Sequence, residues 1–168
     1  MNRKNKILPF EEESSIEFLS KKNDCSLFFL GTHSKKRPDN LTIGRLFDYH
    51  ILDIMELGIT NYKGMSEFPT TYAPKEEMRP CFVFCGSEWE SDEKLAKLRN
   101  LLIDIFRGRA AEMINLDGLE HAIICTAASG LVHFRHYAIL LKKSGTTVTN
   151  FFSYLSFETL FSVKKKVT

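Results

Sequence analysis

A short run of basic and polar side chains is the strongest candidate for chemistry in this sequence. Lysine and arginine side chains bind the phosphates of nucleic acids, with an affinity that falls steeply as the salt concentration rises. Backbone N–H groups near the start of a helix strengthen such an anion site. Short basic runs also occur in merely solvated loops, and that alternative stays open here. The sequence predicts a noncatalytic RNA-binding surface formed by His33, Lys35, Lys36, Arg37, Asn40 and Arg45.

The glycine before this run raises the possibility of a nucleotide-binding phosphate loop. Gly31 ends an apolar segment, as the first glycine of a P-loop does. A P-loop requires the pattern G-x-x-x-x-G-K-[ST], whereas this loop lacks the second glycine and contains Pro38. Nucleotide hydrolysis is therefore not expected.

The cysteines and histidines form no recognisable metal or nucleophile motif. Cys81 and Cys85 lie in an apolar segment whose period of two directs both to one face, whereas structural zinc ligands usually lie on turns. Both thiols are expected to pack in the core, where free cysteine is common. No G-x-S-x-G or H-E-x-x-H pattern is present. Neither an enzyme nor a bound cofactor is predicted.

Charge is distributed unevenly along the 168 residues, although the formal net charge is only +2. Residues 1–50 hold nine Lys and Arg against seven Asp and Glu, residues 51–104 six against ten, and residues 105–168 eight against four. A nucleic-acid surface is a local electrostatic feature, so the segments matter more than the total. The basic final segment supplies the secondary RNA-binding candidates Arg107, Lys142 and Lys143.

Composition places the chain among ordinary globular domains. It is 43% hydrophobic and 26% charged, which excludes disorder throughout. No apolar run approaches the roughly 20 residues that a membrane span requires, and the apolar core of a signal peptide is missing. An intracellular protein that does not enter a membrane is expected.

The elements that position the basic run follow from the spacing of apolar residues. That spacing predicts a helix near 14–23 with a serine N-cap, then a buried strand over 25–30 and a polar loop over 32–40. Apolar positions from 41 to 57 recur at three and four residues, which indicates a helix of about four turns ending at Gly58. The basic run would then connect a strand to the start of a helix.

The second half of the chain predicts a mixture of strands with one secure helix. Ser91 is the expected N-cap of that helix, which ends before Gly108. The alternation favours an α/β fold whose sheet is partly parallel and partly antiparallel. The late strands are expected to be exposed edges that a protein partner can extend. The predicted strands lie at 81–85, at 121–126 and 131–140 as a hairpin, and near 147–152 and 158–163.

Several longer motifs resemble the Brix-domain family over residues 7–145, and more weakly to residue 168. They are SKKNDCSLF at 20–28, GTHSKKRPDNL at 31–41, IGR at 43–45, DYH at 48–50, ELGI at 56–59, LLID at 101–104, FRG at 106–108 and LLKKSG at 140–145. The resemblance implies two intertwined α/β halves, each similar to the anticodon-binding domain of class II tRNA synthetases, with mixed sheets flanked by helices. A single Brix domain would span 1–168: a leader and short helix to residue 23, a core over 24–163 and a short basic tail over 164–168.

The matching branch of that family consists of assembly factors for the large (60S) ribosomal subunit. The resemblance implies a noncatalytic nucleolar factor that binds rRNA, including the 5S rRNA, and helps recruit the 5S particle to the precursor. It further implies three kinds of partner: the regulator of ribosome synthesis protein, the ribosomal proteins associated with 5S rRNA, and the pre-60S particle itself. The alternatives are another Brix-type rRNA-processing factor, a protein-interaction scaffold that never contacts RNA, and an α/β enzyme acting on nucleotides or RNA.

Overall fold

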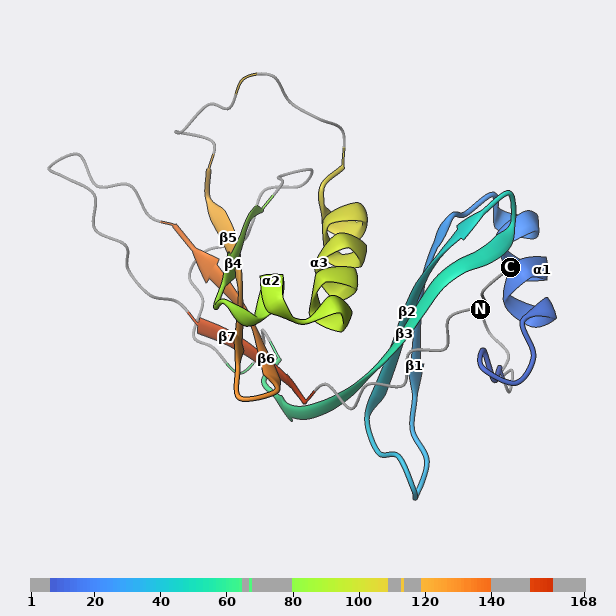
Figure 1. Cartoon of the computed structure of the whole chain (residues 1–168), viewed down its shortest axis with the longest axis horizontal. Helices are drawn as coiled ribbons and strands as arrows, with labels where there is room; N and C mark the ends of the chain where they lie inside the picture. Colours follow the sequence, from blue (N-terminus) through green and yellow to red (C-terminus); the bar gives the residue numbers. More distant parts are fainter. Residues whose placement is uncertain are drawn as a thin grey trace, which may run out of the picture. The chain divides into compact units, whose positions relative to one another are not determined.

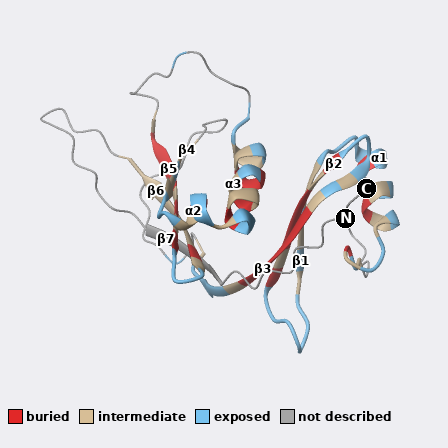
Figure 2. Cartoon of the chain, viewed as in Figure 1, coloured by how far each residue is buried: buried red, intermediate tan, exposed pale blue. Residues whose placement is uncertain are grey.

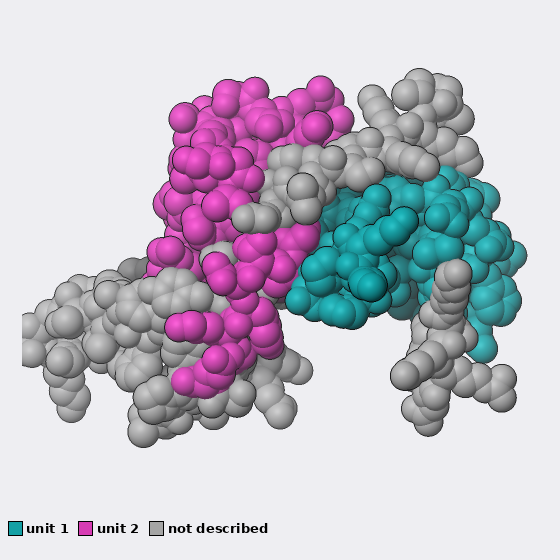
Figure 3. Space-filling view, turned by 90° about the horizontal axis from the view of Figure 1, so that it is seen from below, with its two compact units in different colours: residues 1–57, 160–168 teal, residues 58–159 magenta. Residues whose placement is uncertain are grey.

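The computed structural model describes residues 7–64, 67, 80–108, 113, 119–139 and 152–158. The chain divides into two compact units, residues 1–57 with 160–168, and residues 58–159 (Figure 3). No described helix is long and apolar enough to cross a membrane. The elements are α1 (Ser14–Asn23), β1 (Leu27–Thr32), β2 (Asn40–Phe47), β3 (His50–Tyr62), β4 (Cys81–Cys85), α2 (Glu88–Ser91), α3 (Glu93–Phe106), β5 (His121–Ala128), β6 (Leu131–Ala138) and β7 (Phe152–Glu158) (Figure 1).

The first unit is built from α1 and the antiparallel strands β1, β2 and most of β3. Strands β1 and β2 pair from Leu27 opposite Arg45 to Thr32 opposite Asn40. Strand β2 turns into β3 through Asp48 and Tyr49, whose φ values of 49° and 63° are both positive. Two consecutive positive φ values are the signature of the type I′ turn, which matches the natural twist of a hairpin. A β-hairpin therefore follows the basic run.

The predicted helix over residues 41–57 is wrong, because this segment forms β2 and the first part of β3. Its apolar spacing fitted a helix, but residues 54–58 are buried one after another, as in a strand covered on both faces (Figure 2). Periodicity alone does not separate a buried strand from a buried helix in short apolar runs. The basic run thus leads into a strand, and no helix N-terminus contributes N–H groups to it.

Gly44 on β2 lies opposite Phe28 on β1 and leaves room for the aromatic ring. A Cβ at Gly44 would lie 2.5 Å from Cε1 of Phe28 and 2.7 Å from the backbone oxygen of Asp53. We expect Gly44→Ala to lower the free energy of unfolding by about 1–3 kcal/mol, because overpacking forces strand and ring apart. Urea denaturation followed by circular dichroism measures this loss. The matched control is Gly31→Ala on β1, whose Cβ would meet nothing within 4 Å; equal losses in both variants would contradict the packing argument.

The second unit holds a mixed sheet, as predicted, with α2 and α3 beside it (Figure 1). Strands β4 and β5 pair in parallel, whereas β5 with β6 and β6 with β7 pair antiparallel. The predicted hairpin is confirmed, and its turn residues Ser129 and Gly130 again have positive φ values of 55° and 75°. Strand β7 also pairs with the last residues of β3, from Gly58 to Tyr62. The two predicted C-terminal strands, near 147–152 and 158–163, are misplaced, because β7 occupies the segment between them and shares only Phe152 and Glu158 with their ranges. The other residues of both ranges lie outside the described residues.

Helix α3 is confirmed, although its N-cap differs from the prediction. Its apolar face buries four leucines, and the Asp92 side chain accepts a hydrogen bond from the backbone N–H of Lys94 at 2.8 Å. Ser91, the expected cap, is instead the last residue of the short helix α2. Helix α1 is also confirmed, but Glu13 stands at its N-cap position, and no side chain caps it. Aspartate and serine are comparable capping residues, so the sequence did not distinguish Ser91 from Asp92.

The hydrogen-bonded strand order, β1-β2-β3-β7-β6-β5-β4, corrects the predicted sheet edges. Strands β6 and β7 have neighbours on both sides, whereas β1 and β4 stand at the ends of this order of described strands. The predicted burial of the first strand is accordingly too high, since Phe29 on β1 is half exposed. Cys85 on β4 is also exposed rather than in the core, and Cys81 is intermediate. Edge position follows from pairing between distant segments, which local sequence patterns do not contain.

Two imidazole rings stack between β5 and β6 in the second unit. The His121 and His136 ring centroids lie 4.9 Å apart, and His121 is buried. Burial lowers the pKa of both histidines from the ordinary 6.5; the neighbouring His121 lowers that of His136 further, and Glu120 partly offsets the effect at His121.

A pKa that is lower in the folded state makes stability depend on pH in a defined direction. Around pH 6 the unfolded chain binds more protons than the folded chain, so the free energy of unfolding is expected to fall as the pH drops through 6.5. His136→Phe should weaken this dependence, measured by urea denaturation at about pH 7.5, 6.5 and 5.5. The exposed-ring control, His33→Gln, should retain it. An unchanged pH profile in His136→Phe would contradict the assignment.

Candidate nucleic-acid interface

The predicted basic run forms the loop of the β1–β2 hairpin in the first unit. The loop narrows to a tight turn in which the Ser34 N–H donates to the Arg37 carbonyl at 3.0 Å. The Arg37 N–H donates back to the Ser34 carbonyl at 3.2 Å and to its Oγ at 3.1 Å. Lys35 and Lys36 occupy the two central positions of this turn, and both are exposed. The backbone thus fixes two adjacent cationic side chains at the tip of a hairpin.

His33 and Asp39 flank the turn and face each other across the loop. The Nδ1 atom of His33 lies 3.0 Å from Oδ1 of Asp39, and both side chains are largely exposed. Asp39 has a φ of 51°, a left-handed conformation that aspartate tolerates better than most residues. This pair joins the two sides of the loop next to the residues where β1 ends and β2 begins.

Arg37 and Asn40 converge on Glu56, which lies on β3. Nη1 of Arg37 donates to Oε2 of Glu56 at 2.7 Å, and Nδ2 of Asn40 donates to Oε1 at 3.1 Å. Glu56 and Asn40 are buried, whereas the Arg37 side chain is 63% exposed. Each carboxylate oxygen therefore has a donor, as a buried charge requires.

Arg45 on β2 pairs with Asp53 on β3, with Nε to Oδ2 at 2.6 Å. Both side chains are about 30% exposed. The two arginines of the predicted surface thus have carboxylate partners. For Lys35 and Lys36, by contrast, the structure shows no ion pair within the described residues.

The remaining candidates lie away from this hairpin or outside the described residues. Arg107 is exposed just after α3 in the second unit, where its backbone N–H donates to the Ile103 carbonyl at 2.8 Å. Lys142 and Lys143 are not among the described residues. The structure therefore gathers five of the nine candidates around the β1–β2 loop, namely His33, Lys35, Lys36, Arg37 and Asn40. Arg45 lies on the same hairpin but opposite Leu27, at the end of β2 away from that loop.

Sequence reasoning missed the carboxylates that pair with the two arginines, Glu56 with Arg37 and Asp53 with Arg45. Both lie in the segment over 41–57 that the apolar spacing predicts as a helix, where charged side chains are normally solvated. The consecutively buried residues 54–58 show no period-two alternation, so the helical spacing of the segment was the only pattern that its sequence offered.

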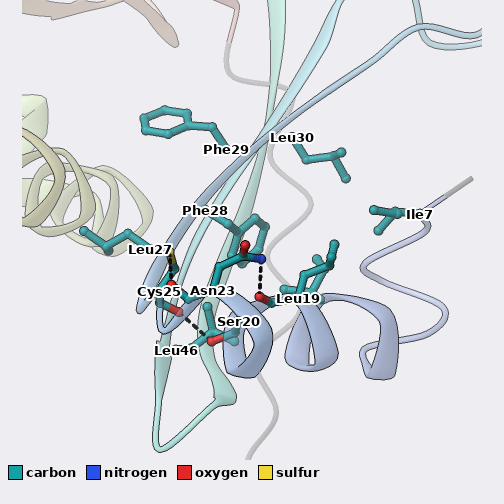
Figure 4. A pocket seen from close by; sticks show the side chains of 11 residues that line it. Ile7, Leu19, Ser20, Asn23, Cys25, Leu27, Phe28, Phe29, Leu30 and Leu46 are labelled. Carbon is teal, nitrogen blue, oxygen red and sulfur yellow. Dashed lines mark hydrogen bonds between the residues drawn. The ribbon is translucent and has the colours of Figure 1, made fainter. Parts of the chain in front are cut away.

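A second feature of the first unit is an apolar cavity of about 410 Å³ between α1 and β1 (Figure 4). Phe28 and Leu30 of β1 and Leu19 of α1 contribute to its lining. The polar groups of Ser20 and Asn23 are occupied, since they donate to the carbonyls of Cys25 at 2.5 Å and Leu19 at 2.7 Å. The cavity therefore presents mainly apolar surface, without the charge that an RNA site needs.

Comparison with known proteins identifies relatives over most of the chain. The model of the family described as Brix domain matches residues 1–166. The chain is 48% identical over 143 residues to the ribosome production factor 2 homologs of Mus musculus and Homo sapiens, covering 85% of this chain and 46% of each relative. It is 46% identical over 151 residues to the ribosome production factor 2 homolog of Drosophila melanogaster, covering 86% of this chain and 45% of that protein.

The chain thus spans about half the length of the curated relatives that it matches. The family match covers nearly the whole chain, and the described elements form the mixed α/β architecture with flanking helices that the sequence motifs implied. The chain belongs to the Brix-domain family.

Proposed function

We propose that this protein is a noncatalytic assembly factor of the large (60S) ribosomal subunit that binds rRNA through the β1–β2 hairpin tip. Relatives that are nearly half identical carry the name ribosome production factor 2 homolog, which supports a role in ribosome production. The observation that carries the RNA-binding part is the pair of exposed, adjacent lysines, Lys35 and Lys36, held at the centre of a hydrogen-bonded turn.

The geometry of the tip suits recognition of RNA by its backbone. Lysine ammonium groups contact phosphates as point charges and do not read base identity. Structured RNA is recognised largely through its shape, phosphates and 2′-hydroxyls. The tip should therefore provide salt-sensitive affinity for folded rRNA with little preference for base sequence.

The fuller proposal places the protein in the nucleolus on the pre-60S particle, with 5S rRNA among its RNA ligands. Its protein partners would be the regulator of ribosome synthesis protein and the ribosomal proteins that accompany 5S rRNA. A single Brix domain over 1–168, with core 24–163, would provide these contacts. Among the described strands, β1 and β4 each have one neighbour, which supports partner binding by strand addition at their outer edges.

Ultraviolet crosslinking of the purified chain to 5S rRNA and to large-subunit rRNA fragments tests this function. Crosslinked peptides should include the loop between β1 and β2, and their yield should fall as salt is raised. Absence of crosslinks at low salt would instead favour the protein-interaction scaffold. Crosslinks confined to other segments would reject the hairpin tip as the RNA-binding surface.

A further inference from the structure

Glu56 is an unexpected neighbour for an RNA-binding loop, because a carboxylate repels phosphate. It lies on β3 and is only 9% exposed, yet it faces the base of the basic loop through Arg37 and Asn40. Burying a charge is costly unless the charge is paired and hydrogen-bonded. Here Arg37 supplies the opposite charge and Asn40 supplies a second donor. The carboxylate is therefore a fixed structural anchor beneath the loop.

Arg37 connects this anchor to the backbone of the turn. Its guanidinium donates to Glu56 at 2.7 Å, while its own N–H and carbonyl make the backbone hydrogen bonds to Ser34 that close the turn. The side chain of Arg37 thus contacts β3, while its main chain closes the turn. The guanidinium charge is balanced by Glu56, whereas the described contacts place no carboxylate on Lys35 or Lys36.

We infer that Arg37 is a positioning residue rather than a phosphate contact. Its ion pair with Glu56, which also accepts a hydrogen bond from Asn40, fixes the turn that presents Lys35 and Lys36. The inference rests on the proposed RNA-binding function of the tip. It divides the basic run over residues 35–37 into two cations that contact phosphate and one that orients them.

The first test needs no RNA and measures the turn itself by amide hydrogen exchange in the full chain. Glu56→Gln keeps the size of the side chain and an oxygen that can accept from Asn40, but removes the charge that holds Arg37. Exchange at the Ser34 and Arg37 amides should become faster in this variant, because the turn loses its anchor. Lys36→Ala should leave exchange at both amides unchanged. Unchanged exchange in Glu56→Gln would overturn the inference.

The second test separates positioning from phosphate contact by the salt dependence of 5S rRNA binding. Loss of one phosphate contact lowers the slope of log affinity against log salt by about 0.7 to 0.9. Lys36→Ala should show that loss. Arg37→Ala and Glu56→Gln should each weaken RNA binding without changing the slope of log affinity against log salt. Because the two residues act as a pair, their effects should overlap: the variant carrying both changes should bind at least about twofold better than it would if the two losses in affinity multiplied.

The outcomes of the two tests are distinct. If Arg37→Ala lowers the slope of log affinity against log salt by about 0.7 to 0.9, both in the unaltered chain and in the Glu56→Gln variant, then Arg37 is a phosphate contact and the inference is overturned. Arg37→Lys retains the charge but not the planar guanidinium, so it should weaken binding as positioning requires. Thermal unfolding of each variant by circular dichroism checks the fold. Failure of the unaltered chain to bind RNA would reject the proposed function alone, because amide exchange still decides whether the pair fixes the turn.

Discussion

Replacing Lys35 and Lys36 together by alanine is expected to weaken binding of 5S rRNA by roughly tenfold or more at physiological salt. Each lysine that contacts a phosphate releases a counterion, so the slope of log affinity against log salt should become shallower by about 1.4 to 1.8. Both side chains are exposed at the centre of a turn closed by main-chain hydrogen bonds to Ser34. Their removal should therefore leave the fold intact. Filter binding or fluorescence anisotropy over a salt series measures both quantities.

The matched control removes the same charge from another part of the first unit. Lys21 and Lys22 are adjacent and exposed in the last turn of α1. Their double alanine variant has the same net charge as the hairpin variant, so an effect of overall charge alone would weaken binding equally in both. Equal losses of affinity in the two double variants would reject the tip as the phosphate-binding surface. An unchanged slope of log affinity against log salt in the double variant of Lys35 and Lys36 would do the same.

Replacing Trp89 by alanine is expected to lower the free energy of unfolding by about 3–5 kcal/mol, the largest stability effect that we predict. Trp89 lies in the short helix α2 and is only 1% exposed. Its indole N–H faces the carbonyls of Cys85 at 3.0 Å and Cys125 at 3.2 Å, and its ring packs edge-on against Phe84 with centroids 5.0 Å apart. One side chain thus joins α2 to the parallel strands β4 and β5.

A second variant at this position separates packing from hydrogen bonding. Trp89→Phe keeps an aromatic ring but removes the donor to both carbonyls, so it should cost about 1–3 kcal/mol and less than the alanine variant. Urea denaturation monitored by circular dichroism measures both, since Trp89 is the single tryptophan and its fluorescence is lost with it. Losses below about 1 kcal/mol in Trp89→Ala would show that α2 does not stabilise the sheet.

Local sequence patterns predicted the elements whose signals are short-range. Helix α3 has a single wide apolar face, and the β5–β6 hairpin surrounds a small turn that ends in glycine. Both features are encoded within a few residues, so they can be recognised without knowledge of the tertiary structure. The prediction for the segment over β2 and β3 failed because its apolar spacing fits a helix, while consecutive burial within the sheet makes it a strand.

The sequence by itself determined which cations the candidate surface contains and that Lys35 and Lys36 lie in a loop. Only the tertiary structure decided which of them are balanced by carboxylates, because Arg37 in the loop and Glu56 on β3 are 19 positions apart and meet only in the folded chain. The pairing depends on the β2–β3 hairpin, whose type I′ turn folds β3 back along β2. Electrostatic pairing acts through space, over distances that local patterns along the chain do not encode. A basic run of three cations in the sequence therefore becomes, in the folded protein, a tip with two lysines supported by an ion pair.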